Sequence, residues 1–252
     1  MSAPILVTQR LSKRFGGLVA TDSLDFDVLP GELHAVIGPN GAGKTTLIKH
    51  LIGELHPDSG RILFDSIDIT MFPSHRRALM GMSSSCQITS VFPDLTALEN
   101  VAIAEQAHHG HSFGFWRPAG REEILNAPAR RALQEVGFSE RPDRPAAELA
   151  YGERRQIEIA MALVSRPKLL LLDEPMAGMG RRESETMVNL LASLKGRYAI
   201  VLIEHDMDAV FALADRITVL VYGRQVASGT PQDIAASVEV RKAYLGDRHA
   251  VR

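Results

Sequence analysis

The stretch GPNGAGKT at residues 38–45 decides the fold. It follows LHAVI (33–37), an apolar run with the length of a buried strand, and it runs into TTLIKHLIGE (45–54), whose apolar residues recur at helical spacing. This order of strand, loop and helix gives the pattern G-x-x-x-x-G-K-[ST] the context that it needs to bind phosphate. Glycines let backbone N–H groups surround phosphate oxygens, and the N-terminus of the helix adds partial positive charge. The sequence therefore predicts an α/β domain that binds a nucleotide.

The residues of this loop have distinct expected roles. Lys44 reaches the β- and γ-phosphates, Thr45 places its hydroxyl on Mg²⁺, and Thr46 bonds a further phosphate oxygen. The alternative is a glycine-rich turn with a chance lysine, which the flanking strand and helix disfavour. ATP and Mg²⁺ are the expected cofactors. The segment's expected nucleotide contacts are Gly38, Pro39, Asn40, Gly41, Ala42, Gly43, Lys44, Thr45 and Thr46.

The composition is that of an ordinary globular protein. Lys plus Arg number 28 against 30 Asp plus Glu, so the formal net charge of −2 argues against a nucleic-acid partner. No run of 18 or more apolar residues could span a membrane, and the start MSAPILVTQR predicts no secretory signal. The single cysteine, Cys86, excludes an intrachain disulfide and favours a reducing compartment.

Two hydrophobic patterns divide the chain. Leu24, Phe26 and Val28 alternate with acidic residues, as in a half-buried strand, and residues 61–69 predict a hairpin that turns at Asp65-Ser66. From 94 to 166 helical spacing takes over, which predicts an inserted helical lobe. The expected helices are at 95–107, 121–138, 153–165, 181–195 and 206–214, with a tail at 231–246, and the later strands are at 169–173, 199–204, 217–223 and 224–229. We expect a core over 1–93 and 167–229, a lobe over 94–166 and a tail over 230–252.

Carboxylates follow a second buried strand, in LLLLDEP at 169–175. A parallel strand places Asp173 and Glu174 at the same edge of the sheet as the glycine-rich loop. Asp173 is expected to hold Mg²⁺ and Glu174 to act as the general base toward water. His205 ends a further apolar strand and is expected to contact the γ-phosphate. The alternatives are solvated loop acids and a structural histidine.

LAYGE at 149–153 makes the assignment more specific. It resembles the signature sequence of ATP-binding-cassette (ABC) ATPases, and the resemblance spans roughly residues 3 to 247. It implies an α/β P-loop NTPase cassette with a mixed-sheet core, an antiparallel β subdomain and an inserted helical lobe. It also implies that Phe15 stacks on adenine, and that Gln87 joins the catalytic and metal-binding residues. The signature residues implied to cover ATP are Ala150, Tyr151, Gly152 and Glu153.

In this family two cassettes pair head to tail, so each ATP lies between the loop of one subunit and the signature of the other. The resemblance therefore implies a second cassette, identical or not, transmembrane permease subunits and, indirectly, a periplasmic substrate-binding protein. It places the chain as a peripheral ATPase on the cytoplasmic face of the inner membrane.

RFGGLVA (14–20), the signature region and the ending GTPQDI with VRKAYLG (229–246) are similar to ATPases of high-affinity branched-chain amino-acid importers. Substrates there are branched-chain or related neutral amino acids. A lipopolysaccharide-export cassette and a soluble, non-transport cassette ATPase are the alternatives. The sequence departs from the family at Ser84, Cys86, Ala150 and Gly180, which bears on turnover rather than on ATP binding.

Overall fold

The computed structural model describes residues 3–85, 91–109, 123–138 and 141–245. Two compact units can be distinguished by their internal contacts. The first, here called the core unit, comprises residues 1–77, 171–174 and 194–252, and the second, here called the helical unit, comprises 78–170 and 175–193.

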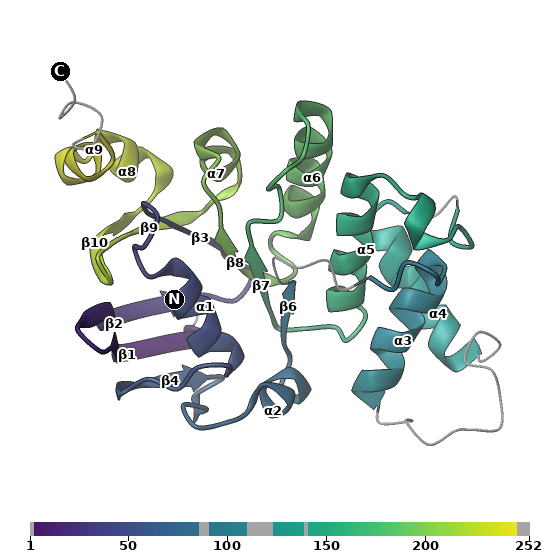
Figure 1. Ribbon diagram of the computed structural model, residues 1–252, viewed down its shortest axis with the longest axis horizontal. Helices are drawn as coiled ribbons and strands as arrows, with labels where there is room; N and C mark the ends of the chain where they lie inside the picture. Colours follow the sequence, from purple (N-terminus) through teal and green to yellow (C-terminus); the bar gives the residue numbers. More distant parts are fainter. Residues whose placement is uncertain (1–2, 86–90, 110–122, 139–140, 246–252) are drawn as a thin grey trace. The chain divides into compact units, whose positions relative to one another are not determined.

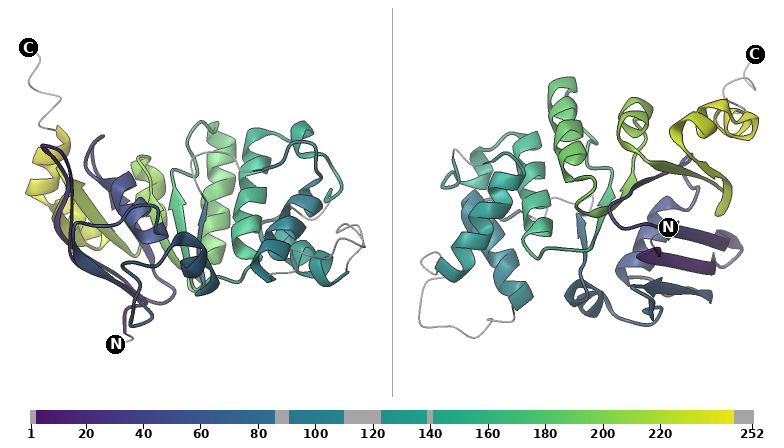
Figure 2. Two further views of the ribbon diagram at one scale, coloured as in Figure 1. Left: turned by 60° about the horizontal axis from the view of Figure 1, so that its bottom comes forward. Right: turned by 180° about the vertical axis from the view of Figure 1, so that it is seen from behind.

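The core unit contains an antiparallel sheet with the strand order β2-β1-β4-β5 (Figures 1 and 2). Its strands are β1 (Leu6–Phe15), β2 (Leu18–Val28), β4 (Ser59–Phe64) and β5 (Ile67–Asp68). Leu24, Phe26 and Val28 are all buried, which confirms the predicted alternation. Asp65 and Ser66 both have positive φ angles, so the hairpin turns where the sequence predicted.

The strands of the second sheet that enter the core unit follow the order β10-β9-β3-β8-β7, and β7 enters it with residues 171–173. These strands are β3 (Leu33–Ile37), β7 (Leu169–Asp173), β8 (Ala199–Ile203), β9 (Arg216–Val221) and β10 (Arg224–Gly229). β3 pairs in parallel with β8 and β9, whereas β10 is antiparallel to β9. Every residue of β3, β7 and β8 is buried, as their continuous apolar sequences predicted.

Helix α1 (Lys44–Ile52) lies between the two sheets (Figures 1 and 2). It ends at Gly53, whose φ of 80° is a left-handed conformation that favours glycine. The helix is therefore shorter than the predicted 45–54. α7 (Met207–Leu213) is capped by Asp206, whose side chain accepts hydrogen bonds from the N–H groups of Asp208 and Ala209.

The C-terminal tail consists of two helices rather than the single predicted one. α8 (Pro231–Ala236) begins at Thr230, which accepts a hydrogen bond from Asp233 N, and α9 (Val238–Leu245) follows. Ser237 separates them because its ψ of 126° is extended. The helical periodicity runs through this residue, so it could not reveal the break.

Helix α2 (Ser74–Leu79) was not predicted, and it delivers a buried arginine to the end of α1. Arg77 donates hydrogen bonds to the carbonyls of His50, Leu51, Thr70 and Phe72. Burial lowers the pKa of Arg77 to about 10. The guanidinium thus supplies donors to the carbonyls of His50 and Leu51 in the last turn of α1.

The helical unit contains β6 (Met82–Ser85), α3 (Ala97–His109), α4 (Glu123–Glu135), the 3₁₀ turn Ala146–Glu148, α5 (Tyr151–Leu163) and α6 (Arg181–Leu194). α3, α4 and α5 pack against one another. α5 starts two residues earlier than predicted, because Ala150 is extended and acts as its N-cap. Among the described residues, no helix is both long and apolar enough to cross a membrane.

Candidate active site

The glycine-rich loop leads directly from β3 into α1, and packing fixes its shape. A Cβ on Gly38 would lie 2.2 Å from the carbonyl oxygen of Leu220. A Cβ on Gly43 would lie 2.4 Å from that of Ala20, and the φ of Gly43 is +102°. Side chains are therefore excluded at both positions.

Gly41 differs from these two glycines. Its φ is +80°, yet a Cβ there would meet no atom of the described residues within 4 Å. The loop is thus open at this point, and α1 begins at Lys44 without a side-chain cap from any residue that the structure describes. An open loop of backbone beside an uncapped helix N-terminus is suited to an anion such as phosphate.

Lys44 is folded back onto the loop. Its Nζ donates to the carbonyls of Gly38 (2.7 Å) and Pro39 (3.2 Å). Burial lowers the pKa of Lys44, whereas the charges of Glu174 and Asp173 act to raise it. The predicted cation and both predicted carboxylates therefore belong to one electrostatic cluster.

Asp173, the last residue of β7, is a buried carboxylate. Its Oδ1 has no hydrogen-bond partner within the described part of the chain. Burial raises the pKa of Asp173, the neighbouring Glu174 raises it further, and Lys44 opposes the shift. A buried carboxylate oxygen without a partner is costly unless a cation approaches it, so this side chain fits the expected Mg²⁺.

Glu174 has a φ of +49°, which is uncommon for a residue with a side chain. Its N–H donates to the carbonyl of Ile203 in β8 (2.9 Å). This bond holds Glu174 beside the end of β8, where His205 follows. Nδ1 of His205 lies 3.9 Å from Glu174 Oε1 and 3.8 Å from Glu204 Oε2.

His205 has 67% of its side chain exposed, whereas Glu204 is buried. The Glu204 carboxylate accepts a hydrogen bond from the N–H of His205 (3.0 Å), which fixes the backbone where the strand ends. The histidine ring is therefore anchored at its base and free to contact a ligand. A carboxylate and an imidazole in the same electrostatic cluster as the lysine of a glycine-rich loop are suited to the hydrolysis of a phosphoanhydride.

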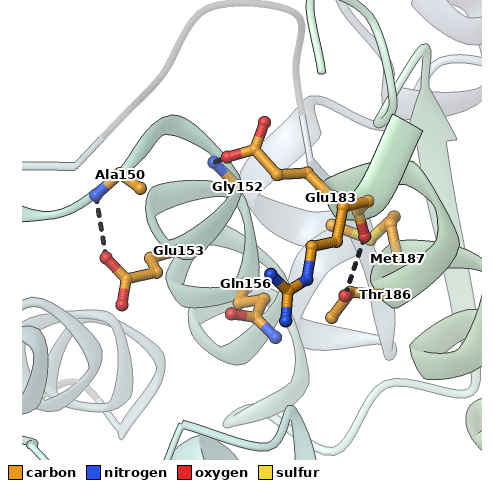
Figure 3. Close-up of a pocket in the computed structure, with 8 residues that line it drawn as sticks. Ala150, Gly152, Glu153, Gln156, Glu183, Thr186 and Met187 are labelled. Atoms are coloured by element: carbon orange, nitrogen blue, oxygen red, sulfur yellow. Dashed lines mark hydrogen bonds between the residues drawn. The ribbon is translucent and has the colours of Figure 1, made fainter. Parts of the chain in front are cut away.

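The signature residues open α5 in the helical unit (Figure 3). Ala150 N donates to Glu153 Oε2 (2.8 Å), which is one half of a capping box. The side chain of Ala150 has no oxygen that could accept the second hydrogen bond of such a box, from the N–H of Glu153. Gly152 N donates instead to Oε1 of Glu183 (3.2 Å), and Glu183 comes from the first turn of α6. The exposed Tyr151 starts the helix.

A family model described as "ABC transporter" matches residues 21–177, more than half of the chain. The chain belongs to the ABC transporter family. A model for the branched-chain amino acid ATP-binding cassette transporter matches residues 224–250 of this cassette.

Known relatives match the cassette over nearly its whole length. It is 39% identical to the high-affinity branched-chain amino acid transport ATP-binding protein BraF of Pseudomonas aeruginosa, over 98% of this chain and 100% of the relative. Identity to LivG of Escherichia coli strain K12, which bears the same description, is 38% with the same coverage. A solved ABC-transporter cassette in its ADP conformation superposes with a TM-score of 0.87 at 30% identity, covering 97% of this chain and 100% of that chain.

These comparisons confirm the predicted α/β P-loop cassette fold and the predicted family. As an ABC ATPase, the cassette binds nucleotide, and its hydrolysis of ATP is coupled to transport. The core unit brings together Lys44, Asp173, Glu174 and His205, as the sequence predicted that a nucleotide site would require.

Several residues that the sequence analysis singled out are either exposed or outside the described residues. Phe15 ends β1 and is 49% exposed, with Lys13 Nζ 5.7 Å from its ring centre. Thr45 is exposed in the first turn of α1. Gln87 and the unusual Cys86 lie outside the described residues, whereas Gly180 is exposed just before α6.

Glu183 contacts the signature backbone, and the sequence analysis did not identify it. The available signal was its place three residues after Gly180, where a glutamate accepts a hydrogen bond from the N-cap N–H. Its second bond, to Gly152, joins residues 31 positions apart, and no local pattern could predict that bond.

Proposed function

We propose that this cassette drives the import of branched-chain or related neutral amino acids. The observation that carries the proposal is the similarity to BraF and LivG over 98% of the chain, together with the match of residues 224–250 to the branched-chain model. The substrate class comes from these relatives, because the ATPase subunit itself does not bind the transported molecule.

We propose that the nucleotide is ATP bound with Mg²⁺. Phe15 stacks on adenine, and the loop from Gly38 to Thr46 wraps the phosphates. Thr45, Asp173 and Gln87 would hold the metal ion, which would neutralise charge on the β- and γ-phosphates. Asp173 Oδ1 supports this assignment, because it has no hydrogen-bond partner in the described part of the chain. Lys44 would exchange its carbonyl partners in the loop for phosphate oxygens.

In the proposed hydrolysis step, Glu174 accepts a proton from water as the water oxygen bonds to the γ-phosphorus. The bond between that phosphorus and the β,γ-bridging oxygen breaks, which yields ADP and phosphate. The exposed imidazole of His205, 3.9 Å from Glu174, positions the γ-phosphate and the water.

The signature is proposed to act on the nucleotide of a second cassette, either a copy of this chain or a non-identical relative. Ala150, Tyr151, Gly152 and Glu153 would cover the γ-phosphate from across the interface, with Gly152 N–H as a donor at the N-terminus of α5. ATP would thereby close the pair, and hydrolysis would reopen it.

Transport requires partners that the cassette moves. We propose that transmembrane permease subunits contact the helical unit and the segment around Gln87, and that a periplasmic binding protein delivers the substrate. The cassette would then be a peripheral protein on the cytoplasmic face of the inner membrane, with no nucleic-acid partner.

The Glu174→Gln variant tests the mechanism. It should still bind Mg-ATP and form a closed dimer, while phosphate release falls by roughly 100-fold or more because the general base is lost. Glu185→Gln, which alters an exposed glutamate of α6 paired with Arg181, is the matched control and should hydrolyse ATP normally. Phosphate release at the wild-type rate in the Glu174→Gln variant would contradict the assignment of the base.

A tagged chain tests the transport role. Purified with the membrane fraction of its own host, it should carry permease subunits with it. In vesicles with those subunits and their binding protein, leucine, isoleucine or valine should stimulate ATP hydrolysis. Stimulation by a lipid substrate alone would refute the amino-acid assignment.

A further inference from the structure

One carboxylate joins the N-termini of two helices in the helical unit. Glu183 Oε1 accepts from Gly152 N in the first turn of α5, and Glu183 Oε2 accepts from Gly180 N just before α6, both at 3.2 Å. Figure 3 shows the Glu183 side chain extending over the start of α5 to Gly152. A Cβ on Gly152 would lie 3.1 Å from Oε1, so the carboxylate lies directly against the signature backbone.

The Gly152 N–H is therefore already bonded to an anion within the same chain. The adjacent cap explains why this acceptor is needed: Ala150 is the N-cap of α5 but has no side-chain acceptor, and Glu153 bonds the N–H of Ala150 rather than that of Gly152. A hydrogen bond from an N–H at a helix N-terminus to a carboxylate is stronger than one between neutral groups.

The same N–H is the proposed donor to the γ-phosphate of the neighbouring subunit. A carboxylate and a phosphate cannot both bond it, because two anions at such close range repel each other. Either the phosphate fails to reach the signature, or the Glu183 carboxylate moves away.

We propose that Glu183 is a positioning residue whose carboxylate occupies the signature in the absence of ATP and is displaced from Gly152 by the γ-phosphate. This inference rests on the proposed two-cassette site. Glu183 then sets the ATP concentration at which two cassettes close, and its second bond links the signature to the Gly180 segment that follows the catalytic glutamate.

The structure provides space for this displacement. A pocket of about 490 Å³ adjoins the carboxylate, and Gln156, Arg182 and Thr186 are among its lining residues (Figure 3). A carboxylate that leaves Gly152 can therefore remain near a cation and polar groups instead of being buried without a partner.

The test measures how much ATP closes the pair. Glu183→Gln is introduced into the Glu174→Gln chain, and dimer formation is followed by sedimentation as Mg-ATP is titrated. The amide oxygen can still accept from Gly152 but carries no charge, so the half-maximal ATP concentration should fall about tenfold, the order expected for one charge-assisted hydrogen bond. Glu185→Gln in the same background removes an equal charge from the same helix, and it should leave the midpoint unchanged within about twofold.

The outcomes separate this inference from the function on which it rests. An unshifted or higher midpoint in Glu183→Gln overturns the role of Glu183 and leaves the two-cassette site intact. Failure of the Glu174→Gln chain to close at any ATP concentration, either with its own copies or with the non-identical cassette that copurifies with its permease subunits, overturns both proposals.

A kinetic measurement in the chain with native Glu174 provides a second test. If Glu183 competes with the phosphate, Glu183→Gln should lower the KM for ATP. A residue that only caps α5 and α6 would instead lower kcat with KM unchanged, and that result would refute the proposal.

Discussion

Acidification from about pH 7.5 to pH 5 is expected to destabilise the protein in part through His34 of β3. The residue is buried, and its ring centre lies 4.5 Å from that of Phe26. Nδ1 is 2.9 Å from the carbonyl oxygen of Asp27, and Nε2 is 2.8 Å from Thr218 Oγ1. A carbonyl only accepts hydrogen bonds, so Nδ1 carries the proton and Nε2 accepts from the threonine hydroxyl.

The magnitude follows from the pKa. Burial, and then the positive charge of Arg216, lower the pKa of His34 from 6.5 to about 3, against the opposing effect of its hydrogen bond to Asp27. In the unfolded chain His34 is therefore protonated near pH 6.5, whereas in the folded chain it is protonated only near pH 3. The stabilisation that comes from keeping His34 neutral is fully present above pH 6.5 and is lost as the pH falls toward 3. Between pH 7.5 and pH 5 the free energy of unfolding is expected to fall by about 2 kcal/mol.

Urea unfolding at the two pH values measures this loss, with His34→Gln as the control. Glutamine keeps a donor and an acceptor but does not titrate. Burial also lowers the pKa of His50, but that residue titrates in both proteins, so its contribution cancels in the comparison. The wild type should lose about 2 kcal/mol more than the variant. An equal loss in both proteins would show that His34 is not held neutral by the fold.

Three further substitutions test the loop and its support. Lys44→Ala should abolish the binding of Mg-ATP in calorimetry, and affinity like that of the wild type would disprove its phosphate contact. Gly43→Ala should weaken nucleotide binding and lower the unfolding temperature, because the new Cβ would lie 2.4 Å from the Ala20 carbonyl; an unchanged protein would show that the loop can shift. Arg77→Met should lower the free energy of unfolding by roughly 3 kcal/mol, because several buried carbonyls lose their donor. Retained stability in denaturant would indicate that water replaces the guanidinium.

Local sequence was sufficient to predict much of this protein. The pattern at 38–45 between a strand and a helix, and the four leucines before Asp173, each describe a single stretch of chain with its own periodicity. Strand boundaries for β3, β7 and β10 agree with the predicted ones. Local pattern was less informative where a helix ends through one residue's backbone angle, as at Ser237, or where it is short, as in α2.

The sequence by itself predicted which residues would carry the chemistry, because glycines, a lysine and two carboxylates at fixed spacing leave few alternatives. Only the tertiary structure decided how they meet. Asp173 Oδ1 has no hydrogen-bond partner among the residues that the structure describes, Lys44 bonds its own loop, and Glu183 bonds Gly152 across 31 residues. These arrangements depend on burial and on contacts between distant segments, whereas hydrophobic periodicity records only which face of an element is buried.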